Sequence, residues 1–450
     1  MQRALFLKIA IIGLLIILLV IPLAMTSNLV HERQQRHQEV VTDIATSYAG
    51  AQQITGPVVA IPWTRIRLTV RPAIGEHPEV REETRTSGIH YLFPSELDVS
   101  GDLGTDTKSR GLFHARVYQW QGLMKGRFEW PDELPVETRE GDRLEVGQPY
   151  LAVALDDPRG IIGQPRLEWN GQPVSVERGS ALNYERRGLH APLPIGAETT
   201  VDFSLALSLR GTERIAFVPV GDANRFELRS DWPHPSFSGR YLPDPESQQI
   251  GADGFRAVWS ISALAAEAAG QIRRGETNCE RNCAYPLDAL SVELVEPVAI
   301  YTLSDRALKY AHLFIVLTFA AFFLFEALKQ LAIHPVQYLL VGLALAVFFL
   351  LLISLSEHLD FVLAYALSAL ACCSLITVYL STILGSRLRG LGFGGALAAL
   401  FAALYFLLRS EDNALMLGSL LIFGLLAGAM IATRKVDWYA LGAPRPRHDD

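Results

Sequence analysis

Charged side chains are scarce in the last third of this 450-residue sequence. Of the 87 charged residues, only 9 lie between positions 310 and 432, whereas 69 lie between positions 26 and 309. Soluble domains carry about 25% charged residues, so this uneven distribution excludes an ordinary soluble enzyme. The aromatic and branched aliphatic residues that fill a core are present, which excludes a fully disordered chain. The composition predicts a membrane protein with a large soluble insert.

Sequence signatures of catalysis are also missing. There is no G-x-S-x-G, G-x-x-x-x-G-K-[ST], H-E-x-x-H or EF-hand pattern, and each of these chemistries needs its residues at a fixed spacing. The glycines between 390 and 395 look like a nucleotide-binding loop, but they open an apolar helix instead of following a strand. We therefore expect no catalytic residues, no cofactor and no metal, and predict that the protein is not an enzyme.

Cysteine is rare, with four residues in the chain. Cys279 and Cys283 lie in a polar segment of the insert (CERNC), where an oxidising compartment favours a disulfide. A zinc site is the alternative, although no second Cys or His pair stands at ligand spacing. Cys372 and Cys373 lie inside an apolar run, where thiols behave as small hydrophobic groups.

Long apolar runs predict membrane spans, because crossing the hydrocarbon layer takes about 20 apolar residues. The first run lies at 5–25 and is expected to be an uncleaved anchor. A cleavable signal peptide is the alternative, but its apolar region is usually about 7–15 residues long and the uncharged run 9–25 is longer. Five further spans are predicted at 310–328, 336–355, 361–384, 391–408 and 414–432.

The positions of Lys and Arg in the short loops predict the orientation of these six spans, because basic loops stay in the cytoplasm. Basic residues mark one side of the membrane: Arg3, Lys8, Lys329, Arg387, Arg389, Arg434, Lys435, Arg445 and Arg447. The alternate loops carry Glu357, Asp360, Glu411 and Asp412 against a single Arg409. Both termini, including the tail 433–450, are therefore expected in the cytoplasm, and residues 26–309 on the opposite side.

The insert at 26–309 has the pattern of a mainly β domain. Short runs of β-type residues, separated by Gly and Pro, lie at 113–118, 150–154, 201–209, 214–220 and 290–295. In 201–209 the apolar residues alternate with Asp, Ser and Ala, as in a strand with one buried face. We predict an antiparallel, sandwich-like domain, a short helix at 261–274, and an extension of the first helix into 28–53.

The charge of this domain restricts its partners. It carries 30 basic and 39 acidic residues, a balance that argues against binding to nucleic acid. The expected partners are the lipid bilayer around the spans and an unidentified component of the compartment that contains the domain.

Small residues at helical spacing predict close packing between helices. Gly395, Ala399 and Ala403 recur at every fourth position of the fifth span, and Gly424 and Gly428 have the same spacing in the last span. These residues are candidates for helix packing and not for ligand binding.

Trp232 and His234 are weaker functional candidates in the segment WPHPSFSG. His234 could act as a base beside Ser236 or Ser238. Two prolines more often stiffen a loop, so a structural role is the simpler interpretation.

Ionisable residues near the ends of the spans are functional candidates, because the membrane disfavours charge. His334, Glu357 and His358 belong to this group. Glu326 is expected to pair with Lys329, three residues further along the helix.

Several of these segments resemble the inner-membrane protein CreD family. The similar segments are 110–113 (RGLF), 232–239 (WPHPSFSG), 294–301 (LVEPVAIY), 304–310 (SDRALKY), 322–326 (FFLFE), 333–342 (IHPVQYLLVG) and 355–358 (LSEH). The resemblance covers most of the chain and is densest from 290 to 384. It implies a cell-envelope integrity protein of the bacterial inner membrane, with the insert in the periplasm, and a link to a two-component regulon and to colicin and β-lactam stress. It implies no catalytic residues.

Three functions remain open from the sequence. The first is a non-enzymatic envelope protein whose β domain contacts a periplasmic partner or a wall component. The second is a transporter or channel-like protein in which the β domain acts as a gate. The third is a periplasmic hydrolase that uses His234 with a nearby Ser or Asp.

Overall fold

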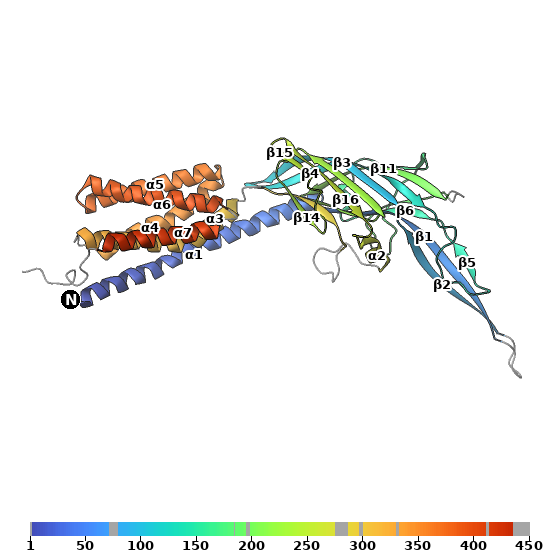
Figure 1. Cartoon of the computed structure of the whole chain (residues 1–450), viewed down its shortest axis with the longest axis horizontal. Coiled ribbons are helices and arrows are strands. Elements are labelled where there is room, and N and C mark those ends of the chain that lie inside the picture. The colour runs from blue at the N-terminus through green and yellow to red at the C-terminus, as the bar shows by residue number, and fades with distance from the viewer. Residues whose placement is uncertain are drawn as a thin grey trace, which may run out of the picture. The chain divides into compact units, whose positions relative to one another are not determined.

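The computed structural model describes residues 2–71, 80–183, 185–194, 199–274, 287–296, 300–329, 333–410 and 414–434. The chain divides into a helical unit, residues Met1–Arg36 and Val298–Asp450, and a β unit, residues His37–Pro297 (Figure 1). The β unit is shorter than the expected insert 26–309, because the helices on both sides of it extend beyond the apolar runs. The polar extension of the first helix is present, since α1 continues to Ser47.

The helical unit contains six helices among the described residues: α1 (Gln2–Ser47, which continues into the β unit), α3 (Ile300–Lys329), α4 (Pro335–Ser356), α5 (Phe361–Ile383), α6 (Arg387–Arg409) and α7 (Ala414–Thr433). Five of them, α1 and α3 to α6, are long and apolar enough to cross a membrane by length and composition. The described apolar stretch of α7 is shorter, Met416–Gly428. The sixth predicted span is therefore not confirmed.

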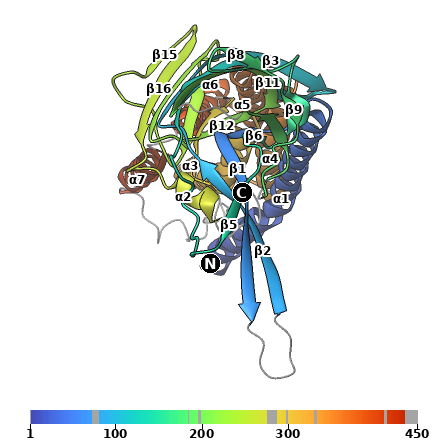
Figure 2. The ribbon, with the colours of Figure 1, turned by 90° about the vertical axis from the view of Figure 1, so that its right-hand side faces the viewer.

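The β unit is built from two sheets. The first sheet has the strand order β14-β17-β12-β1-β6-β10-β9, with β2 and β5 also paired to β1. Its strands are β1 (Gln52–Arg71), β2 (Val80–Leu92), β5 (Arg143–Val146), β6 (Tyr150–Leu155), β9 (Glu177–Arg178), β10 (Gly188–Pro192), β12 (Arg214–Val218), β14 (Pro235–Gly239) and β17 (Leu290–Leu294). Figure 2 shows β1 and β2 leaving the rest of this sheet as a long ribbon.

The second sheet has the order β15-β16-β13-β3-β4-β11-β7-β8. Its strands are β3 (Glu96–Arg110), β4 (Phe113–Glu129), β7 (Arg166–Trp169), β8 (Gln172–Val174), β11 (Thr200–Thr212), β13 (Ala223–Ser230), β15 (Gln249–Gly251) and β16 (Gly254–Ser262). Most neighbours are antiparallel, as predicted. Two pairings, β1 with β12 and β3 with β13, are parallel and join strands far apart in the chain.

The core of the β unit lies between the two sheets. In β11 the predicted alternation is present, because Val201, Phe203 and Leu205 are buried while Asp202 is exposed. Such alternation places one face of each strand in the core. Trp120 of β4 is fully buried and meets Phe217 of the opposite sheet, with the ring centroids 5.2 Å apart.

Two glycines make room for the Trp120 ring. Gly101 and Gly122 face each other across β3 and β4, and a Cβ atom at either position would clash with that ring. The ring therefore lies flat over both strands and reaches the first sheet. Replacing a buried tryptophan by alanine typically costs about 3–5 kcal/mol, so this residue is a major contributor to the sandwich.

The predicted helix at 261–274 is mostly wrong. Only Ala268–Arg273 is helical (α2), and residues up to Ser262 belong to β16. Ile261 pairs with Asn224 of β13, so the tertiary pairing overrides the helical preference of the alanine-rich sequence.

Candidate functional sites

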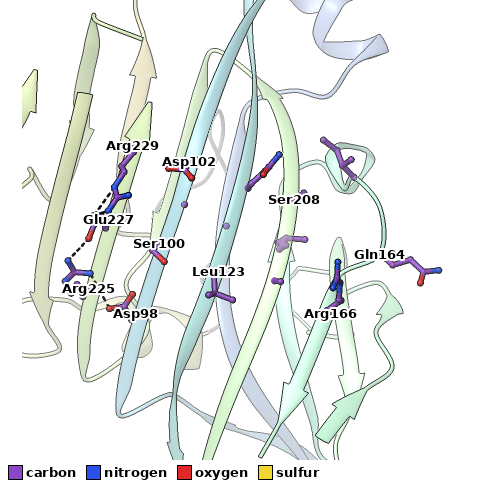
Figure 3. A pocket seen from close by; sticks show the side chains of 16 residues that line it. Asp98, Ser100, Asp102, Leu123, Gln164, Arg166, Ser208, Arg225, Glu227 and Arg229 are labelled. Atoms are coloured by element: carbon purple, nitrogen blue, oxygen red, sulfur yellow. Dashed lines mark hydrogen bonds and ion pairs between the residues drawn. The ribbon is translucent and has the colours of Figure 1, made fainter. Parts of the chain in front are cut away.

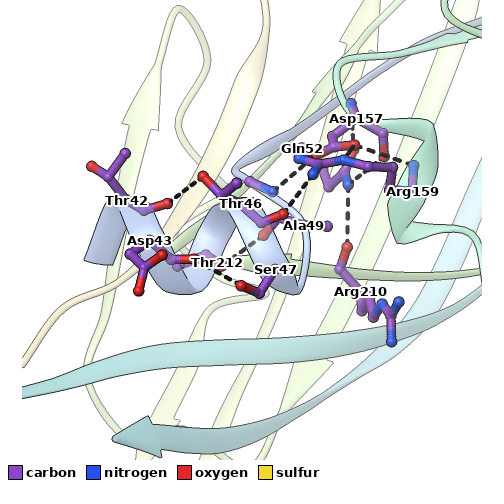
Figure 4. Close-up of polar contacts among 11 residues, drawn as sticks. Thr42, Asp43, Thr46, Ser47, Ala49, Gln52, Asp157, Arg159, Arg210 and Thr212 are labelled. Carbon is purple, nitrogen blue, oxygen red and sulfur yellow. Dashed lines mark hydrogen bonds and ion pairs between the residues drawn. The ribbon is translucent and has the colours of Figure 1, made fainter. Parts of the chain in front are cut away.

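The end of α1 is fixed to the sandwich by a set of hydrogen bonds, which we call the helix clamp (Figure 4). The Thr212 hydroxyl donates to the carbonyl oxygen of Ala49 at 2.7 Å. The Arg159 guanidinium donates to the carbonyl oxygen of Thr46 at 2.5 Å. The last carbonyls of a helix have no partner within it and carry a partial negative charge, so a guanidinium here is a favourable cap.

Asp157 organises the other half of the helix clamp. Its carboxylate accepts from Nε and Nη2 of Arg159, at 2.9 and 2.6 Å, and from the backbone N–H of Gly50 at 3.1 Å. Burial works in the opposite direction, but these bonds from Arg159 and Gly50 lower the pKa of Asp157 below its ordinary value. The buried amide of Gln52 completes the set by donating to the carbonyl oxygens of Asp157 and Arg210.

The proline-flanked segment around Trp232 is held by its backbone and by an arginine. The Arg116 guanidinium lies 3.9 Å from the centre of the Trp232 ring, a cation–π contact. The indole N–H of Trp232 donates to the carbonyl oxygens of His234, at 3.0 Å, and of Val295, at 3.2 Å. This geometry fits the structural role proposed for the segment.

The alternative role of His234, as a base beside a serine, finds no support in the described hydrogen bonds. His234 is exposed, and no hydrogen bond within the described residues joins its imidazole to Ser236 or Ser238. The Ser238 hydroxyl instead donates to the Glu293 carboxylate at 2.9 Å and lies 2.7 Å from the Ser291 hydroxyl.

A polar hollow lies on the outer face of the second sheet (Figure 3). Its most ordered part surrounds Glu227 of β13, which receives hydrogen bonds from Arg225, at 2.6 Å, from Arg229, at 2.8 Å, and from Arg256, at 2.9 Å. The Glu227 side chain is only 9% exposed. Hydrogen bonds from the three arginines lower the pKa of Glu227 from 4.5 to about 2.

Sequence reasoning missed this cluster around Glu227. The signal was present in part, because Arg225, Glu227 and Arg229 alternate along one strand and must share one face. The contribution of Arg256 depends on the pairing of β16 with β13. No local sequence pattern predicts this pairing.

The helical unit contains a buried charged group. Glu326 of α3 forms an ion pair with Lys8 of α1; the Lys329 side chain lies outside the described side chains, so its predicted pair with Glu326 stays a prediction. Its carboxylate also accepts from the Tyr338 hydroxyl at 2.8 Å and from the backbone N–H of Ile333 at 3.2 Å. Glu326 therefore connects α1, α3 and the start of α4, although it lies 318 positions from Lys8.

The three candidates at helix ends have different environments. His334 is the N-cap of α4, where its imidazole accepts from the Val336 N–H at 3.3 Å. Glu357 follows the last turn of α4 and pairs with Arg33 of α1, with Nε and Oε1 3.3 Å apart. His358 is exposed. His334 and Glu357 lie at opposite ends of α4, so the structure does not bring the three together in one site.

The predicted packing stripe on α6 faces away from the other described helices. Gly395 and Ala399 are exposed, and a Cβ atom at Gly395 would meet nothing within 4 Å. The close contact is one residue earlier, where a side chain at Gly394 would clash with Thr377 of α5. Adjacent positions are about 100° apart around a helix, so the prediction found the small residues but chose the wrong face.

The remaining packing and cysteine predictions differ in their outcome. Ala403 is half-buried on α6. A Cβ atom at Gly424 or Gly428 of α7 would meet no described atom within 4 Å, which contradicts their assignment as close-packing positions within the described part of the chain. Cys279 and Cys283 lie outside the described residues, and their disulfide remains a prediction.

No group of three or more His, Cys, Asp or Glu side chains in the described ranges has the arrangement of a metal site. Three charged clusters among the described residues are ion-pair networks: the helix clamp, the Glu227 cluster and the Glu326 cluster. In each, a carboxylate is held by one or more cationic side chains.

Comparison with known proteins places the chain in a family. The family described as Inner membrane protein CreD matches residues 4–439. The Inner membrane protein CreD of Escherichia coli (strain K12) is 34% identical over 432 residues, which cover 96% of this chain and 93% of that protein. The match extends over both the helical unit and the β unit. The chain therefore belongs to the CreD family of inner membrane proteins.

Proposed function

We propose that this protein maintains the cell envelope of a bacterium under stress, as a non-enzymatic scaffold whose β unit contacts an envelope component outside the cytoplasm. The helices anchor it in the inner membrane. Membership of the CreD family supports the envelope role, and the unequal distribution of Lys and Arg in the loops supports an extracytoplasmic β unit.

The observation that carries the scaffold proposal is the helix clamp. Only four residues separate Ser47, the end of α1, from Gln52, the start of β1. This connection is hydrogen-bonded to Thr212 and Asp157, and Arg159 donates to the last turn of α1. A domain that recognised its partner independently of the membrane would need only a flexible linker. A clamped connection holds the residues between α1 and β1 in one ordered conformation, which suits a domain that acts together with its membrane helices.

The experiment compares a candidate catalytic residue with the helix clamp. A strain that lacks the protein and is sensitive to envelope stress is complemented with His234→Gln, with Arg159→Ala, or with the unchanged chain. Gln retains a polar group but cannot act as an imidazole base. For a scaffold we expect His234→Gln to complement nearly fully, and Arg159→Ala to complement poorly.

The opposite result would contradict the scaffold. General-base catalysis contributes typically about 10²–10⁴-fold to a rate, so a hydrolase that uses His234 would lose complementation with His234→Gln. Immunoblots and the unfolding temperature of each purified variant establish that the protein is present and folded. Exposed Arg143 of β5 provides a control for the loss of a surface arginine, as Arg143→Ala.

A second candidate function is transport, which the Glu326 cluster favours. Ionisable residues inside membrane helices are rare and mark ion pathways or structural pairs. If Glu326 carries protons, Glu326→Gln should abolish function and proton flux in reconstituted vesicles while the protein stays folded. If it is structural, the same change should lower stability and leave any flux unchanged.

A further inference from the structure

The outer face of the second sheet contains a polar groove formed by two adjoining hollows. One has a volume of about 670 Å³ and the other of about 680 Å³, and they share Asp98 and Arg225. The strands β3, β4 and β11 form the floor. Short side chains there, such as Ser100, Ala206 and Ser208, leave open space above the sheet. We call this surface the sheet groove.

The walls of the sheet groove come from the strands on either side. Arg225, Glu227 and Arg229 of β13 line one wall, and Gln164 and Arg166, before and at the start of β7, line the other (Figure 3). The groove therefore runs along the strands. The stretch of β3 that lines it, Glu96–Asp102, spans roughly 20 Å at about 3.4 Å per residue, which fits an extended chain better than a compact small molecule.

The arginine wall is organised before any ligand arrives. Glu227 accepts from Arg225, Arg229 and Arg256 at distances of 2.6 to 2.9 Å. Each guanidinium has five N–H donors, and these bonds use only some of them. The remaining donors are held in a fixed direction, which reduces the entropy lost when a ligand binds.

The charge of the groove lining is balanced. The hollow that contains Glu227 has three carboxylates, Asp98, Asp102 and Glu227, and three guanidinium groups, Arg166, Arg225 and Arg229. A polyanion or a polycation would meet as many like charges as opposite ones, so neither gains electrostatically. An uncharged hydroxyl group, in contrast, donates to a carboxylate and accepts from a guanidinium or amide.

The described lining of this hollow contains no aromatic residue, and its aliphatic members are Leu123, Ile162, Ala206 and Leu207. The adjoining hollow adds Leu97, Phe203 and Ala223, of which Leu97 and Phe203 are buried in the core. A peptide with apolar anchors would find no deep apolar pocket here. A sugar chain presents hydroxyl groups at short intervals, and the amides of Gln121 and Gln164 add donors and acceptors of the same kind.

We infer that the sheet groove binds an uncharged, linear oligosaccharide chain. The inference deepens the proposed function, because it gives the β unit a ligand class, and it rests on the proposal that this unit contacts an envelope component. Binding is measured on purified protein without an envelope phenotype, so a negative result here leaves the complementation result unaffected.

The test uses the full chain in detergent and a tetramer of N-acetylglucosamine as the probe, followed by saturation-transfer NMR and calorimetry. Ala206 is exposed on the groove floor, so Ala206→Trp should fill the groove and weaken binding at least ten-fold. Gln119→Trp is the matched control, since Gln119 is exposed on β4 outside the lining, and it should bind as the unchanged chain does.

Arg166→Ala removes a donor from the opposite wall and keeps the test decisive if Ala206→Trp does not fold. We expect it to weaken binding several-fold. Equal binding by Arg166→Ala and the unchanged chain would overturn the inference. So would the absence of binding to the tetramer, or tighter binding of oligoglutamate, oligolysine or an uncharged peptide than of the tetramer.

Discussion

At the scale of single residues, Glu227 makes the most specific prediction about stability. Glu227→Gln leaves three neighbouring arginines without their shared carboxylate, and hydrogen bonds to charged groups are worth about 1.5–3 kcal/mol each in favourable sites. Because the arginines are 41–60% exposed and screened by solvent, we expect the variant to lose about 1–3 kcal/mol in total. The unfolding midpoint of the full chain at neutral pH measures this loss.

The pH dependence follows from the same carboxylate. The pKa of Glu227 is lowered from 4.5 to about 2, so its contribution is present above about pH 4.5 and is lost as the pH falls toward 2. The unchanged chain should lose stability in this window through Glu227, and Glu227→Gln should lack that part of the loss. Glu168→Gln, an exposed change on the same sheet, should retain it. Identical acid profiles for Glu227→Gln and the unchanged chain would contradict the lowered pKa.

Substitutions of Trp232 and His234 distinguish a packing role from a catalytic role for the segment that contains both. Trp232→Ala removes the ring stacked on Arg116 and both indole hydrogen bonds, and because the ring is only half-buried we expect a loss of about 1–3 kcal/mol, below the usual cost for a buried ring. His234→Gln changes an exposed side chain and should stay within about 0.5 kcal/mol of the unchanged chain. Chemical denaturation of the two variants tests the order; a larger loss at His234 would contradict it.

At the scale of helices, the rotation of α6 about its own axis determines which glycine packs against α5. Gly394→Leu places a side chain against Thr377 of α5 and should separate the two helices, whereas Gly395→Leu points into open space. Both changes add the same apolar residue and should insert equally well. We expect only Gly394→Leu to lower the unfolding temperature in detergent, measured by size-exclusion chromatography after heating. Equal loss in both variants would mean that Gly395 also packs against a surface.

The junction of α1 and the first strand allows a similar comparison. Thr212 is 2% exposed, and Thr212→Val keeps its shape but removes the donor to the carbonyl oxygen of Ala49. An unpaired buried carbonyl costs about 1–3 kcal/mol. Hydrogen exchange of the amides from 44 to 50 should accelerate, while Thr86→Val on exposed β2 should leave it unchanged. Unaltered exchange in Thr212→Val would exclude a stabilising clamp at this point.

At the scale of the whole molecule, the orientation across the membrane is the central prediction. Alkaline phosphatase is active only outside the cytoplasm, so a fusion after Gly221 in the β unit should be active. A fusion after Gly385, between α5 and α6, should be inactive, because the positive charges of Arg387 and Arg389 at the start of α6 favour the cytoplasmic side. Activity at Gly385 would reverse the topology. A second, cytoplasmic reporter at both positions provides the reciprocal control.

Sequence patterns were sufficient to predict the long membrane helices and several strands of the β unit, although not the end of β16. The apolar run of α4 and the alternation in β11 are patterns of neighbouring residues. A membrane helix has a continuous apolar run and a half-buried strand has alternating apolar and polar residues, so local patterns predict both. The extension of α1 and the two-unit organisation followed from the same signals, since charge and hydropathy change sharply along the chain.

Which polar groups contact each other depends on the tertiary fold and could not be predicted from local sequence patterns. Glu326 pairs with Lys8, 318 positions away. Arg256 reaches Glu227 because β16 pairs with β13, and Gly394 rather than Gly395 meets α5 because of the rotation of α6. Periodicity limits the face on which a side chain lies, but the partner of that face is set by the packing of elements remote in the chain, and a rotation of one residue is enough to change it.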